Sequence, residues 1–92
     1  MKTKLALLLV EDREDDALLV TEELRRAGFD LDWMRVESAS ETAHALKSRS
    51  WDVVISDFSL PAFSAPDALM VVRQHDPDLP FILCSGAVGE ET

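Results

Sequence analysis

The stretch WDVVISDFSLP, Trp51 to Pro61, is the clearest indication of the fold. It contains an unbroken apolar run that leads through Ser56 to an acid, Asp57, and a Leu-Pro pair stops the segment a few residues later. A continuous apolar run is typical of a strand buried on both faces, as in a parallel sheet. We therefore predict a strand over 52–56. Two similar runs predict strands over 5–10 and 81–85, and a weaker, partly apolar segment predicts an edge strand over 31–38.

Between these runs the apolar residues recur at helical spacing. We predict helices over residues 14–27, 40–49 and 65–75. Gly28 has the place of a C-terminal stop for the first helix. Ser38 and Ser64 each precede an acid by three residues, which is the spacing of a helix N-terminal cap. In the third helix we expect Leu69 and Val72 to face the core.

The alternation β-α-β-α-β-α-β predicts an α/β doubly wound domain, with a parallel sheet and helices on both faces. We expect residues 1–92 to form one domain. Apolar residues make up 47% and charged residues 29% of the chain, an ordinary globular balance. The net charge of −9 argues against direct nucleic-acid binding. The apolar run at 5–10 is too short for a signal peptide, so we expect a cytoplasmic protein without a membrane segment.

Polar side chains follow three of the predicted strands. Glu11 and Asp12 follow the first, Asp57 follows the third, and Ser85 ends the fourth. Because ligands of open α/β sheets bind beyond the carboxyl ends of the strands, these groups are expected to meet on one rim. Three acids gathered there require a compensating cation. Oxygen ligands with water favour Mg²⁺.

Each of these residues also has a purely structural explanation. Residues 14–16 are acids at a helix start, where the helix dipole alone favours them. Asp57 is suited to start a turn, and Ser85 to bond its own loop. Cys84, the only cysteine, is interpreted as an inert buried thiol of a strand. His44 and His75 fall within or at the end of helices, and we expect neither to be catalytic.

The segments LLLVEDREDD, DVVISDFSLP and FILCSGAVGEE, in this order and spacing, resemble the receiver domain of bacterial two-component response regulators. The resemblance implies a flavodoxin-like fold with strand order 2-1-3-4. It also implies a phosphorelay in which Asp57 accepts a phosphoryl group from a histidine kinase or phosphotransfer protein. Asp12 would bind Mg²⁺ directly, Glu11 largely through water, and Ser59 through its backbone carbonyl. Ser85 would be the switch hydroxyl.

The chain departs from the full family pattern at its C-terminal end. A complete receiver has five strands and five helices, so we expect this one to be truncated, without the lysine that the family carries at the end of strand five. An alternative is therefore a receiver-like interaction module that is not phosphorylated. Without a fifth strand, the segment 81–85 becomes an exposed edge, which predicts a homodimer or an exchange of elements between copies.

An enzyme that turns over an aspartyl phosphate is a further alternative. Such phosphatases and phosphotransferases usually carry a second acid two residues after the nucleophile, as general acid and base. Here that position is Ser59. We therefore expect the protein not to be an enzyme.

Overall fold

The computed structural model describes residues 3–57 and 63–84. Within these residues four strands alternate with three helices. Their bounds, in chain order, are β1 Thr3–Val10, α1 Glu14–Arg26, β2 Phe29–Val36, α2 Ala39–Ser48, β3 Val53–Asp57, α3 Ala65–His75 and β4 Phe81–Cys84. The helix bounds agree with the predicted ranges to within one residue at each end.

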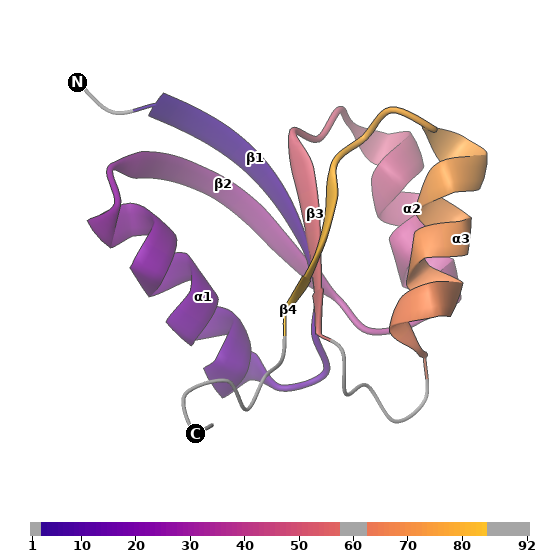
Figure 1. Cartoon of the computed structure of the whole chain (residues 1–92), viewed down its shortest axis with the longest axis horizontal. Coiled ribbons are helices and arrows are strands. Elements are labelled where there is room, and N and C mark those ends of the chain that lie inside the picture. Colours follow the sequence, from indigo (N-terminus) through magenta and orange to yellow (C-terminus); the bar gives the residue numbers. More distant parts are fainter. Residues whose placement is uncertain (1–2, 58–62, 85–92) are drawn as a thin grey trace.

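All four strands are parallel and lie in the order β2-β1-β3-β4, so the predicted α/β fold class and strand order are confirmed. Figure 1 shows α1 on one face of the sheet and α2 with α3 on the other. The core follows this division. Leu7 and Leu9 pack on the α1 side, whereas Leu8 and Val10 pack on the side of α2 and α3. Because helices cover both faces of the sheet, the central strands are buried on both sides, as their continuous apolar sequences require.

Strand β3 is buried along its whole length, Asp57 included. The segment before it is held by side chains. The indole Nε1 of Trp51 donates to the carbonyl oxygen of Ala45 at 2.9 Å, and the Arg49 guanidinium lies 4.5 Å from the centre of the Trp51 ring. The main-chain N–H of Ala6 donates to the carboxylate of Asp52 at 2.7 Å. These contacts fix where β3 enters the sheet beside β1, and therefore where Asp57 emerges.

The caps predicted for the second and third helices are present. Ser38 Oγ accepts from the N–H of Glu41 at 3.1 Å, and Ser64 Oγ accepts from the N–H of Asp67 at 3.2 Å. After α1, Gly28 has a φ of +105°, a left-handed value that favours glycine. The local signals in the sequence therefore set the helix ends.

Several strand bounds and the burial of two side chains differ from the sequence predictions. Strands β1 and β2 begin at Thr3 and Phe29, each two residues earlier than predicted, and β3 lies one residue later than predicted. Strand β2 ends at Val36 rather than Ser38, because Ser38 is the N-cap of α2. Leu69 is 37% exposed, and Ala68 occupies the buried position on α3 instead. Cys84 is only partly buried, because β4 lies at an edge of the sheet among the described strands.

None of the helices in the described part of the chain is long and apolar enough to cross a membrane.

Candidate functional site

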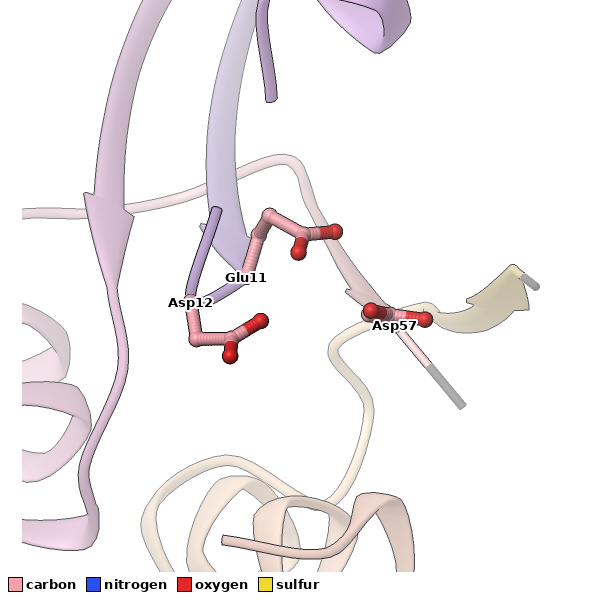
Figure 2. Close-up of side chains that lie close together, drawn as sticks. All are labelled: Glu11, Asp12 and Asp57. Carbon is pink, nitrogen blue, oxygen red and sulfur yellow. The ribbon is translucent and has the colours of Figure 1, made fainter. Parts of the chain in front are cut away.

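Three carboxylates converge at the carboxyl ends of the two central strands. Glu11 and Asp12 follow β1 directly, and Asp57 is the last residue of β3. One oxygen from each carboxylate can be chosen so that the three lie within 4.8 Å of one another. Figure 2 shows the side chains of Glu11 and Asp12 reaching from the end of β1 toward Asp57. The sequence prediction that these acids share one rim is confirmed.

The register of the central strands explains this convergence. Strands β1 and β3 are parallel neighbours, and Val10 pairs with Ser56. The next residues along the two strands are Glu11 and Asp57, which therefore leave the sheet at the same level. A shift of one residue in either strand would turn its acid to the opposite face. The apolar residues of β1 and β3, which must face the core, thus fix the register that brings Glu11 and Asp57 together.

The site is more buried than a surface patch of acids. Glu11 is 3% exposed and Asp57 6% exposed, whereas Asp12 is half-buried. One oxygen of the Glu11 carboxylate accepts the main-chain N–H of Arg13 at 3.1 Å. Sequence reasoning could not tell which of the adjacent acids Glu11 and Asp12 would be buried. Both acids directly follow the strand, so only the path of the chain after Val10 determines which of the two carboxylates is buried.

The electrostatics of the cluster show in the pKa of Glu11, which rises from 4.5 to about 7. Burial is the main cause, and the neighbouring carboxylates of Asp57, Asp12 and Asp16 add to it, while the N–H of Arg13 opposes it. A buried carboxyl among other acids holds its proton because a further negative charge is disfavoured there. A divalent cation at this point would relieve the repulsion.

The donor set fits a hard cation. All three groups are carboxylates, which are the ligands that Mg²⁺ selects, and Asp12 is partly exposed to the solvent that supplies the waters Mg²⁺ retains. Glu11, Asp12 and Asp57 are therefore the described residues that could hold such an ion.

Two neighbours of the cluster were not assigned to it from the sequence. Cys84 pairs with Asp57 in the register of β3 and β4. The pKa of its thiol is raised by burial first, and then by the charges of Asp57, Glu11 and Asp16. Asp16, in the first turn of α1, acts on both Glu11 and Cys84 although its position favoured a role in the helix dipole alone. The position of Cys84 near the end of a predicted strand, like that of Asp57, is the sequence feature that could have assigned Cys84 to the neighbourhood of the cluster.

Other predicted site residues lie elsewhere. Ser59 and Ser85 are outside the described residues. His44 and His75 are exposed on α2 and at the end of α3, on the face of the sheet opposite α1. Neither histidine is part of the acidic cluster formed by the described residues.

The parallel sheet of order β2-β1-β3-β4 with an acidic cluster at its carboxyl edge is a doubly wound α/β domain whose candidate site lies beyond the strand ends. The sequence model of the response regulator receiver domain matches residues 7–92. The chain belongs to this family. No curated protein matches the sequence.

Solved structures agree with this assignment. The chain is similar to a response regulator receiver protein from Sinorhizobium medicae, with 26% identity and a TM-score of 0.71; the match covers 89% of this chain and 66% of that one. It is also similar to a chain in the complex of the histidine kinase ThkA with the response regulator protein TrrA, with 27% identity, a TM-score of 0.71, and coverage of 92% and 69%.

A third structure shares the fold at lower identity. It is the receiver domain of a sensor histidine kinase from Pseudomonas aeruginosa, in which a magnesium ion is coordinated in the active site cleft. Identity is 20%, the TM-score is 0.73, and the match covers 94% of this chain and 71% of that one. The chain thus spans 66–71% of the length of these three structures.

Proposed function

We propose that the protein is a phosphoacceptor of a two-component phosphorelay, in which Asp57 takes a phosphoryl group with Mg²⁺ bound at the acidic cluster. The observation that carries this proposal is the convergence of three carboxylates, two of them nearly fully buried, at one end of a parallel sheet. The magnesium ion in the Pseudomonas receiver domain supports the choice of cation. The complex of ThkA with TrrA supports a histidine kinase as the donor.

The reaction is a transfer of the phosphoryl group from nitrogen to oxygen. A carboxylate oxygen of Asp57 forms a bond to phosphorus while the bond from phosphorus to the imidazole nitrogen of a phosphohistidine breaks. The nitrogen keeps the electron pair, and because the other ring nitrogen of the phosphohistidine carries a proton, the leaving group is neutral histidine. Bound Mg²⁺ would offset the charge on the phosphoryl oxygens, which is the main requirement of such transfers. Glu11 and Asp12 would hold the ion, and the buried end of β3 orients Asp57.

The test is phosphorylation by a small donor. The 92-residue chain is incubated with acetyl phosphate, with Mg²⁺ or with EDTA, and its intact mass is followed. We expect one labile phosphoryl group that needs Mg²⁺ and that Asp57→Asn abolishes. Asp30→Asn, at an exposed position on β2, is the matched control and should label normally. If the chain is never labelled, the interaction module is the better description, and continued release of phosphate would indicate an enzyme.

We also propose that two copies associate through β4. Among the described strands β2 and β4 form the edges of the sheet, and the two edges differ in character. Strand β2 exposes Asp30 and Asp32, charges that discourage pairing with another strand. Strand β4 has no charged residue, and Ile82 and Leu83 are 51% and 54% exposed. An uncharged edge strand with exposed apolar side chains is suited to pair with the same strand of a second copy.

Sedimentation velocity over a range of concentrations tests this association. Leu83→Lys should shift the chain to monomer, because it puts a charge on the pairing edge. Met34→Lys is the control, since Met34 is 42% exposed on the other edge strand. Both variants reduce the net negative charge equally, so general repulsion cannot explain a difference. A wild-type monomer at every concentration, or equal effects of both variants, would refute pairing through β4.

A further inference from the structure

The main chain of Glu11 is held by the end of β2. Its N–H donates to the carbonyl oxygen of Val36 at 2.9 Å, and its carbonyl oxygen accepts from Nη1 of Arg35 at 3.2 Å. Glu11 is the first residue after β1, whose pairing with both neighbouring strands ends at Val10. The first of these bonds is the last rung of the β1–β2 ladder, and the bond from Arg35 extends the restraint to the carbonyl group of Glu11.

The orientation of the Glu11 carboxylate depends on the same short segment. Its Oε2 accepts the N–H of Arg13, two residues along the chain. Arg13 in turn pairs with Asp16 of α1 at 3.5 Å. The side chain of Glu11 thus accepts a hydrogen bond from the main chain of the segment that directly follows Glu11. A shift of the Glu11 peptide would therefore move the carboxylate relative to Asp57.

Arg35 is itself fixed from the other side. Its Nη1 lies 3.6 Å from a carboxylate oxygen of Glu37. The N–H of Glu37 donates to the carboxylate of Glu41 in the first turn of α2 at 2.9 Å. The Arg35 side chain is only 29% exposed, so its bond to Glu11 is partly shielded from water. Arg35 therefore connects the start of α2 with the acidic cluster.

We propose that Arg35 is a positioning residue, which holds the peptide of Glu11 so that its carboxylate stays in the acidic cluster. The consequence for metal binding rests on the proposed function. Sequence reasoning did not single out Arg35, because a lone arginine on an edge strand carries no distinctive signal. Its role depends on a contact between residues that are 24 positions apart.

The direction in which the Mg²⁺ affinity changes when Arg35 is replaced distinguishes a positioning role from a purely electrostatic one. A cation close to a metal site repels the metal, so removing the Arg35 charge alone would tighten Mg²⁺ binding. Loss of positioning has the opposite effect, since a ligand that is no longer held by its hydrogen-bonded surroundings binds a metal less well, commonly by tenfold or more. We expect the second effect, with Mg²⁺ binding weakened roughly tenfold in Arg35→Met.

Three measurements on Arg35→Met test the proposal, with Glu37→Gln as the matched control. The control removes the charge of Glu37 but leaves an amide oxygen that can still accept from the Arg35 guanidinium, so we expect the hydrogen bond of Arg35 to Glu11 to remain. Hydrogen exchange, resolved by residue and read without metal, should show faster exchange of the N–H groups of Glu11 and Arg13 in Arg35→Met and little change in Glu37→Gln. Titration calorimetry should show weaker Mg²⁺ binding in Arg35→Met alone. Phosphorylation at saturating Mg²⁺ should return to the wild-type rate.

Each result decides between the alternatives. Unchanged exchange at Glu11 and Arg13, or tighter Mg²⁺ binding in Arg35→Met, would overturn the positioning role. Faster exchange throughout the chain would assign Arg35 to overall stability and would also overturn it. If the wild-type chain binds no Mg²⁺, the proposed function fails, whereas the exchange measurement still decides whether Arg35 holds Glu11.

Discussion

The raised pKa of Glu11 predicts that the metal-free protein loses stability as the pH rises. In the unfolded chain this carboxyl releases its proton near pH 4.5, whereas in the folded chain it keeps the proton until about pH 7. Between these values the folded state binds more protons, so the free energy of unfolding must fall with rising pH. Each pKa unit corresponds to about 1.4 kcal/mol, so the full loss is about 3 kcal/mol.

This loss is large for a small domain, whose total free energy of unfolding is commonly about 5–15 kcal/mol. Glu11→Gln removes the ionisable group while keeping a side chain of similar size. We expect wild type and Glu11→Gln to have similar stability near pH 4, and the variant to be more stable by up to about 3 kcal/mol above pH 7. Comparing the two chains at each pH cancels the titration of the groups that do not interact with Glu11.

The assay is urea unfolding followed by tryptophan fluorescence at a series of pH values, in EDTA. Glu22→Gln, at an exposed position on α1, is the control and should follow the wild-type curve. With Mg²⁺ added at neutral pH, wild type should recover stability and Glu11→Gln should recover less, because the ion offsets the charge of the Glu11 carboxylate. Parallel pH curves for wild type and Glu11→Gln in EDTA would refute the electrostatic description of the cluster.

Three further predictions concern packing, backbone and reactivity. Leu8→Ala should lower the free energy of unfolding by about 3 kcal/mol, because Leu8 is fully buried between the sheet and the helices α2 and α3; a loss below about 1 kcal/mol in urea unfolding would contradict this packing. Gly28→Ala should cost about 1 kcal/mol through its left-handed φ alone, since an added Cβ meets no atom within 4 Å; an unchanged urea midpoint would show that the turn relaxes freely. Cys84 should react with iodoacetamide more slowly in the folded than in the unfolded chain at pH 8, because its raised pKa leaves less thiolate; equal rates would contradict the acidic surroundings of the thiol.

The architecture could be predicted from the sequence because its signals are local. The unbroken apolar run of β3 requires cover on both faces, and the serines before α2 and α3 bond to the first turn of each helix. Those features determine the element order, and the order with short connections leads to a parallel doubly wound sheet. The convergence of Glu11, Asp12 and Asp57 then follows from which strand ends lie at one edge.

The remaining features depend on tertiary packing. Leu69 and Ala68 are neighbours on α3, and the angle at which the helix meets the sheet decides which of them is buried. The partial exposure of Cys84 follows from the edge position of β4. Arg35 reaches Glu11 only because β2 lies beside β1 in register. Such contacts between distant residues have no periodic signature in the sequence.

The position of the phosphoryl group on the chain shows whether Asp57 is its acceptor. After labelling with acetyl phosphate and Mg²⁺, borohydride reduces an aspartyl phosphate to the corresponding alcohol, which peptide mass mapping can locate. We expect one modified residue, Asp57, and no modification in EDTA. Modification at Asp12 or Glu11 instead, or an unmodified chain under conditions in which Mg²⁺ is bound, would contradict it.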